Sequence, residues 1–214
     1  MCFSPEASFI ASGVLGVIGV SSLRRTKGKY KLIGAIPLIF AFQQFIEGFQ
    51  WISVPHSPLS QLLSYGFVFT AFLIWPIYIP LAIFIIDEKT RNITKWFVAT
   101  GVGTAILLLS VLVTKPLTVF IAGSISYNID MPPNWFILAG YFIAVCGTPM
   151  VSSKLGFKIL GLMGLISAVI AGLVFYYSFV SVWCFFVAAI SGLIYLYARQ
   201  DKPDYKLKPF DKAA

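Results

Sequence analysis

Long stretches of apolar residues dominate the chain and are separated by short polar or proline-containing segments. Seven stretches have the length of a membrane-spanning helix, which needs about 20 apolar residues to cross roughly 30 Å of hydrocarbon. They cover residues 7–23, 32–54, 59–86, 94–114, 134–153, 155–177 and 180–198. The alternating strands of about ten residues that build membrane barrels do not fit this pattern. The pattern therefore predicts an all-α, polytopic membrane helix bundle with seven transmembrane helices.

Composition supports this class and sets the domain organisation. Of the 214 residues, 58% are hydrophobic and only 11% are charged, which is typical of a membrane protein. We expect one seven-helix transmembrane domain at residues 1–199 and a flexible polar tail at residues 200–214. The one long link, residues 115–133, has a mixed character and is expected to lie along the membrane surface as a short helix or a hairpin.

Basic residues fall almost entirely on one side of the predicted bundle. The loops after the first, third, fifth and seventh stretches carry Arg24, Arg25, Lys27, Lys29, Lys31, Lys89, Arg91, Lys95, Lys154, Lys158, Arg199, Lys202, Lys206, Lys208 and Lys212. The opposite side holds only Lys115. Since positive loops mark the cytoplasmic side, we expect the N-terminus outside and the C-terminus in the cytoplasm. The net charge of +8 then reflects topology and attraction to the anionic lipid bilayer, so no nucleic-acid partner is expected.

The second stretch contains an acidic residue and several carboxamides in an otherwise apolar segment. At 100° per residue, one third of the helix circumference collects Gln43, Gln44, Glu47, Gln50 and Trp51. The opposite side carries Phe42, Phe45, Phe49 and Ile52, which suit lipid or apolar neighbours. Glu47 is therefore predicted to face the interior of the bundle, in the outer half of the membrane.

A carboxyl group at this depth costs free energy, about 2.5–3.5 kcal/mol on insertion scales, which makes Glu47 a candidate functional residue. Two interpretations stay open. In one, Glu47 binds a ligand, an ion or a proton. In the other, it is a protonated acid that only fixes helix packing through a hydrogen bond to a neighbouring helix.

Other residues in the same half of the membrane could share a pocket with Glu47. We include Glu6, Tyr65, Trp75 and Trp183 as candidate ligand-binding residues. A carboxylate with Trp and Tyr walls suits a cation or amine through charge and cation–π attraction. Aromatic residues are also common at membrane interfaces, which is the simpler explanation for any one of them.

The three cysteines, Cys2, Cys146 and Cys184, have no metal-ligand spacing, and the chain has one histidine, His56. Cys2 and Cys184 are both expected near the outer face, where an oxidising compartment permits a disulfide. A single histidine excludes a multi-histidine zinc site and a bis-histidine haem. The seventh stretch has no lysine for a retinal Schiff base, so we expect no metal and no cofactor.

Small residues and prolines indicate close helix contacts. Gly164, Ala168 and Gly172 recur every four residues in the sixth stretch, and Gly13, Gly16 and Gly19 recur every three residues in the first. This spacing favours packing within the chain, with a homo-oligomer as the alternative. Pro76 and Pro80 predict a kink in the third stretch, which serves structure or acts as a gating hinge.

The opening MCFSPEASF and the segment PLIFAFQQFIEGFQW at residues 37–51 resemble a known but uncharacterised group. Its members are small bacterial seven-helix membrane proteins that begin Met-Cys-Phe/Trp-Ser and carry a Gln-Gln…Glu-Gly…Trp segment. The resemblance implies a multi-pass protein of the bacterial inner membrane. The group has no established activity, so no site is carried over, and Cys2, Ser4, Glu47 and Trp51 become the first residues to test.

These observations leave three classes of function open. The leading hypothesis is an outward-facing intramembrane pocket around Glu47 that binds or passes a small polar or cationic solute. The second is an intramembrane enzyme for a lipid or lipid-linked substrate, with Glu47 and Glu6 as an acid–base pair. The third is a scaffold or sensor subunit of a membrane complex.

Overall fold

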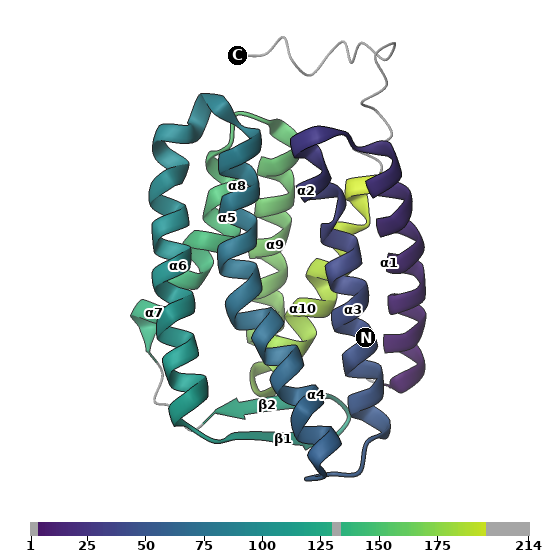
Figure 1. Ribbon diagram of the computed structural model, residues 1–214. Coiled ribbons are helices and arrows are strands. Elements are labelled where there is room, and N and C mark those ends of the chain that lie inside the picture. The colour runs from purple at the N-terminus through teal and green to yellow at the C-terminus, as the bar shows by residue number, and fades with distance from the viewer. Residues whose placement is uncertain (1–3, 130–133, 196–214) are drawn as a thin grey trace.

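The computed structural model describes residues 4–129 and 134–195, which form a bundle of long helices with a two-stranded hairpin at one end (Figure 1). The first half of the chain contains α1 (Pro5–Arg25), η1 (Gly28–Tyr30), α2 (Lys31–Gly34), α3 (Ile36–Ile52), α4 (Pro58–Phe69), η2 (Thr70–Ile74), α5 (Trp75–Ile86), η3 (Glu88–Thr90) and α6 (Arg91–Thr114). The second half contains β1 (Leu117–Ile121), β2 (Ile125–Ile129), α7 (Trp135–Phe142), η4 (Ile143–Gly147), α8 (Thr148–Val151), α9 (Leu155–Val174), η5 (Tyr176–Ser178) and α10 (Phe179–Ser191).

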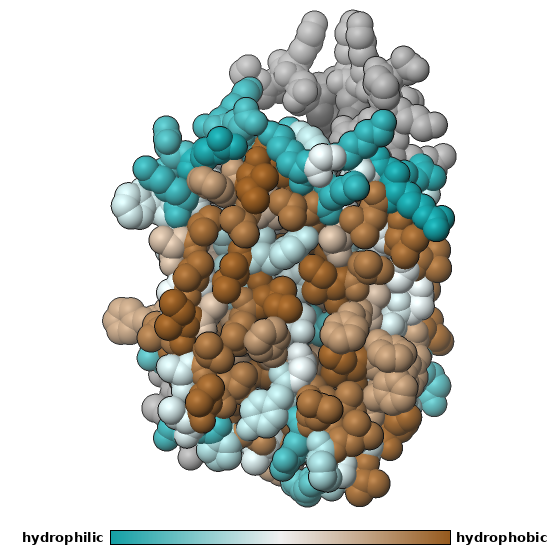
Figure 2. Space-filling model, in the orientation of Figure 1, coloured by the Kyte–Doolittle hydropathy of each residue, from teal (hydrophilic) through white to brown (hydrophobic). Residues whose placement is uncertain are grey.

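Among the described residues, six helical segments are long and apolar enough to cross a membrane. They are Pro5–Arg25, Gly28–Ile52, Pro58–Ile86, Glu88–Thr114, Leu155–Val174 and Tyr176–Tyr195. A shorter apolar helix, Trp135–Val151, stands where the fifth span was predicted. Figure 2 shows a broad hydrophobic band over the middle of the bundle. The chain is therefore an all-α membrane bundle, and the described helices follow the seven predicted stretches in order.

The two ends of the bundle differ in character. One end, which we call the basic end, holds the α1–α2, α5–α6 and α8–α9 turns, and hydrophilic side chains gather there (Figure 2). Lys29 joins the first two of these turns, because its Nζ lies 2.6 Å from Glu88 Oε1. The other end, the hairpin end, holds the α3–α4 turn and the two strands (Figure 1). That the basic end lies in the cytoplasm stays a prediction.

The link between α6 and α7 forms an antiparallel hairpin, one of the two structures expected for it. Leu117 pairs with Ile129 and Ile121 with Ile125, around a turn in which Gly123 has a φ of 70°. The Tyr127 ring stacks on Phe67 of α4, with 4.4 Å between the ring centroids. The hairpin therefore packs against the bundle instead of lying free on the membrane surface.

Pro76 and Pro149 each follow a π-helical turn, and the two turns have the same internal arrangement. In η2 the Trp75 N–H donates to Thr70 O, and Pro76 has no N–H to offer the next carbonyl, that of Ala71. The Tyr141 hydroxyl donates to Ala71 O instead. In η4 Pro149 likewise has no N–H to offer the carbonyl five residues earlier, that of Ala144. Thr148 Oγ1 donates to this carbonyl instead, over 2.6 Å. Each proline thus frees a carbonyl that a side-chain hydroxyl satisfies.

Pro80 lies inside α5 and frees the carbonyl of Pro76, which meets Gly101 of α6. A Cβ built on Gly101 would lie only 1.9 Å from Pro76 O and 3.4 Å from the Ala144 side chain. Only a glycine allows this approach, which brings α6 against both π-helical turns. The predicted kink region is therefore a tightly packed contact in the middle of the bundle.

The small residues of α9 face neighbours within the chain. A Cβ on Gly164 would lie 3.7 Å from Cys146 Sγ, and Gly172 approaches Phe179. On α1, in contrast, nothing among the described residues lies within 4 Å of a Cβ built on Gly13 or Gly16. A homo-oligomer through small-residue helix faces stays a prediction. Of these two helices, α1 leaves room for a partner at Gly13 and Gly16.

Candidate functional site

The predicted polar face of the second span is present on α3 and points into the bundle. Gln43, Gln44, Glu47 and Gln50 are each 0% exposed. The other side of the helix exposes Phe42, Phe45, Phe49 and Ile52. A one-sided polar stripe of this kind is stable only if other helices cover it, and α1, α4 and α10 all contact α3.

Glu47 lies near the centre of this stripe and accepts hydrogen bonds from two helices. Gln44 Nε2, one turn earlier on α3, donates to Glu47 Oε2 over 3.2 Å. The Ser181 hydroxyl of α10 donates to Glu47 Oε1. The carboxyl group therefore links α3 to α10, two helices that are far apart in the sequence.

The carboxamides on either side of Glu47 extend the polar contacts along α3. Toward the hairpin end, Gln50 Nε2 donates to Ser60 Oγ of α4 over 2.7 Å, and Ser64 Oγ donates to Gln50 Oε1 over 3.2 Å. Toward the middle of the bundle, Trp75 Nε1 donates to Gln43 Oε1 over 3.0 Å. The stripe thus connects α3 with α4, α5 and α10.

Several polar atoms of this region have no hydrogen-bond partner among the described residues. They include Gln44 Oε1, Trp51 Nε1 and, on α1, Ser8 Oγ, all of them buried. Gln43 Nε2 also lacks a well-formed hydrogen bond, although the Cys184 thiol lies nearby. A buried acceptor without a donor costs about 1–3 kcal/mol, and native proteins usually satisfy such atoms with protein groups or water.

The other predicted site residues divide into three groups. Trp75 joins the stripe through Gln43, as described above. Glu6 in the first turn of α1 is exposed and Tyr65 on α4 is 40% exposed, so neither side chain is enclosed with Glu47. This arrangement does not support Glu6 and Glu47 as an acid–base pair.

Trp183 and Cys184 are buried on α10, close to the polar stripe without belonging to it. Trp183 Nε1 donates to Gly164 O over 3.0 Å, and Cys184 is an electrostatic neighbour of Glu47. Cys2 lies outside the described residues, but Cys184 is a free cysteine, so the structure does not support the predicted disulfide between them.

Sequence reasoning missed Ser181 and Ser60, which are direct partners of Glu47 and Gln50. A signal for Ser181 was available, because Ser178, Ser181, Cys184, Ala188 and Ser191 follow helical spacing on one face of the last span. Such a face of small and weakly polar residues indicates close contact with another helix. The sequence did not indicate which helix that would be.

Two cavities lie beside the stripe and meet at three shared residues. The hairpin-side cavity has a volume of about 620 Å³ and lies among β2, α7, α9 and α10. The basic-side cavity has a volume of about 90 Å³ and extends from mid-bundle to Ile33 and Ile194. Tyr141, Trp183 and Cys184 line both.

Glu47, Gln43 and Gln44 are not in the walls of either cavity. Cys184 relates the cavities to the polar stripe, because it lines both and is a neighbour of Glu47. An outward-facing opening at Glu47 itself stays a prediction.

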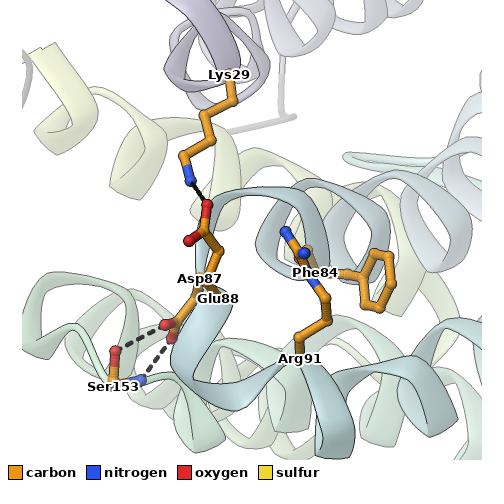
Figure 3. A network of polar contacts seen from close by, with 6 residues as sticks. All are labelled: Lys29, Phe84, Asp87, Glu88, Arg91 and Ser153. Atoms are coloured by element: carbon orange, nitrogen blue, oxygen red, sulfur yellow. Dashed lines mark hydrogen bonds and ion pairs between the residues drawn. The ribbon is translucent and has the colours of Figure 1, made fainter.

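A second buried carboxylate, which the sequence did not single out, lies at the basic end. Asp87 follows α5 and accepts hydrogen bonds from the backbone N–H and hydroxyl of Ser153, both over 2.7 Å (Figure 3). Ser152 Oγ and Thr90 Oγ1 donate to the same carboxylate over 2.6 and 2.9 Å. Burial raises the pKa of Asp87, but the hydrogen bonds from Ser152, Ser153 and Thr90 outweigh burial and hold it well below its usual range.

Three of the four donors bind Asp87 Oδ2 and one binds Oδ1, and these contacts join the α5–α6 turn to the α8–α9 turn. Lys29 and Glu88 form an exposed ion pair nearby, and such pairs contribute little to stability (Figure 3). This cluster is a structural clamp, which leaves the α3 stripe and the adjacent cavities as the candidate functional site.

Comparison with known proteins places the chain in a family. Searches of curated proteins and of solved structures found no significant match. The model of a family of unknown function, DUF6629, matches residues 1–208. The chain belongs to this family of unknown function.

Proposed function

We propose that this membrane protein binds or passes a small polar or cationic solute, with Glu47 as its charged or proton-exchanging group. Gln43, Gln44, Gln50 and Trp51 shape the site in this proposal. The proposal includes the predicted orientation and a location in the bacterial inner membrane.

The observation that carries the proposal is the unsatisfied acceptor beside the buried acid. Gln44 uses its Nε2 to bind Glu47, and its Oε1 has no donor among the described residues. An acid and a neighbouring carbonyl oxygen that needs a donor suit a group with several N–H or O–H bonds. An ammonium group is such a donor, with three N–H bonds, and a water molecule that carries protons to and from Glu47 is another.

The alternative is that Glu47 is a helix clasp. The bonds to Gln44 and Ser181 support this alternative, since they join α3 to α10 without any ligand. The clasp does not account for the remaining unsatisfied atoms, which a packing role would be expected to remove. The two roles of Glu47 predict different effects of Glu47→Gln, which replaces the acid by a neutral group of similar shape.

The test is the thermal unfolding of detergent-solubilised protein with and without a series of ammonium ions, from ammonium to trimethylammonium, each of which has at least one N–H bond. Wild-type protein is expected to be stabilised by at least one of them, because a ligand that binds only the folded state raises the unfolding temperature. Glu47→Gln is expected to lose this response while unfolding at a similar temperature without ions. Glu6→Gln, the same change at an exposed carboxylate, is the matched control and should respond as wild type.

The proposal is wrong if Glu47→Gln responds to the ions as wild type does. It is also wrong if no ion stabilises the wild type and Glu47→Gln unfolds at a clearly lower temperature than the wild type, which is the result expected if the only role of Glu47 is to hold α3 to α10.

A further inference from the structure

The hairpin-side cavity is a separate feature from the Glu47 stripe and has its own chemistry. Its volume of about 620 Å³ falls within the roughly 300–1,000 Å³ of small-molecule sites. Its walls are mostly apolar and rich in rings, and the described residues that line it include no Lys, Arg, Asp or Glu. Such walls suit an uncharged ligand.

Rings form the deep part of this cavity. Trp183 stacks on Phe179 with 5.5 Å between centroids and an interplanar angle of 21°, and it contacts Phe142 at 5.2 Å. Tyr141 meets Trp183 edge-on at 5.7 Å. Two bonds fix these rings, because the Trp183 N–H donates to Gly164 O and the Tyr141 hydroxyl to Ala71 O. A rigid aromatic wall of this kind favours a planar ring by stacking and edge contacts.

The polar groups of the cavity lie at its hairpin end. Asn134 uses its Oδ1 to cap α7 by accepting from the backbone of Phe136 and Ile137. This leaves the Nδ2 of Asn134 as a donor in the cavity wall, which Asn128 of β2 also lines. A ligand with rings at one end and an acceptor at the other would match both parts of the cavity.

The cavity reaches the surface of the bundle between α7 and α9. Leu138 of α7 is 40% exposed and Val169 of α9 is 56% exposed, and both line the cavity. Val169 precedes Val174, the last residue of α9, by five residues, or about 7.5 Å along the helix. The opening therefore lies at the depth of the hydrocarbon, where a molecule reaches it from the membrane and not from water.

We propose that the hairpin-side cavity binds an uncharged amphipathic molecule with a planar ring system, which is dissolved in the membrane and arrives between α7 and α9. Its ring lies against Trp183 and Phe142, and its polar end lies at Asn134. The site does not depend on the proposed role of Glu47.

The test uses N-phenyl-1-naphthylamine, an uncharged ring compound whose fluorescence rises in an apolar site, and protein in lipid nanodiscs. Saturable binding above that of empty nanodiscs is expected. Val169→Trp fills the opening and is expected to weaken binding by about tenfold or more. Ile170→Trp is the matched control, because Ile170 is the next residue on α9, is 48% exposed and does not line the cavity.

Leu138→Trp, on the other side of the opening, is a second blocking variant if Val169→Trp does not fold. Binding that both variants leave unchanged would overturn the proposal, as would binding no stronger than to empty nanodiscs. Competition separates a ring site from a groove for lipid chains: 2-naphthol is expected to displace the probe, and 1-dodecanol is not. Equal displacement by the two alcohols would show a chain groove and overturn the proposal.

Discussion

Single residues decide how closely the helices of this bundle approach each other, and Gly101 shows this most directly. The Pro76 carbonyl, freed by Pro80, occupies the space that a side chain at residue 101 would need. The atom in the way belongs to the backbone of α5, so it does not move aside as a flexible side chain would.

We therefore predict that Gly101→Ala destabilises the protein by about 1–3 kcal/mol, the usual cost of overpacking. Gly103→Ala is the control, because nothing among the described residues lies within 4 Å of a Cβ at Gly103. That variant should gain up to about 1 kcal/mol from helix propensity. Unfolding in detergent, followed by circular dichroism, measures both. Equal stability of the two variants would contradict the close contact.

Part of the candidate site could be predicted from the sequence alone. Helical spacing alone placed Gln43, Gln44, Glu47 and Gln50 on one inward face, because 100° per residue is a fixed property of a helix. The partners could not be read in this way. Ser181 is 134 residues from Glu47, and no local rule predicts which two faces of a bundle meet.

At the scale of helices and turns, the fold joins segments that are far apart in the sequence, and Asp87 is the clearest case. Its carboxylate joins the α5–α6 turn to the α8–α9 turn, 66 residues apart at Ser153. The two π-helical turns are a similar case, because a proline in a helix frees a backbone carbonyl, as Pro76 and Pro149 do here. Which hydroxyl satisfies it, Tyr141 or Thr148, depends on packing that a helical pattern does not record.

The Asp87 clamp predicts a pH dependence of stability. The pKa of Asp87 is lower in the folded protein than its usual value of about 3.9, so the folded state favours the carboxylate. The stabilisation is complete above the usual value and is lost as the pH falls through the lower folded pKa. We expect the unfolding temperature of the wild type to fall as the pH is lowered from about 6 toward 3.

Asp87→Asn separates this effect from other carboxyl groups. It should be less stable than the wild type at pH 6 and should lose less on acidification, because it has no charge to neutralise. Glu88→Gln is the comparison: Lys29 also lowers the pKa of Glu88, but that ion pair is exposed, so Glu88→Gln should change the pH profile less than Asp87→Asn does. A wild-type profile in Asp87→Asn would show that the clamp does not depend on charge.

At the scale of the whole molecule, the two ends of the bundle differ, and two cavities inside it share three wall residues. Tyr141, Trp183 and Cys184 separate the hairpin-side cavity from the basic-side cavity. Residues of both π-helical segments lie in or next to this layer, because Tyr141 bonds to η2 and Cys146 of η4 lines the basic-side cavity. Local π-helical turns are frequent at functional sites, and here they adjoin the only layer that these two cavities share.

The orientation that the loop charges predict for these two ends can be tested directly. Positive loops stay in the cytoplasm, so the basic end should face inward and the hairpin outward. Ala122 in the hairpin turn and Asn92 at the start of α6 are both exposed and uncharged, so a cysteine at either leaves the loop charges unchanged.

With Cys2 replaced by serine, Cys146 and Cys184 remain, and both are buried. A membrane-impermeant maleimide applied to intact cells should therefore label Ala122→Cys and not Asn92→Cys, whereas permeabilised cells should show both labelled. The opposite pattern in intact cells would reverse the orientation. It would also place the opening between α7 and α9 in the inner leaflet, so the membrane face that supplies a ligand to the hairpin-side cavity follows from this one measurement.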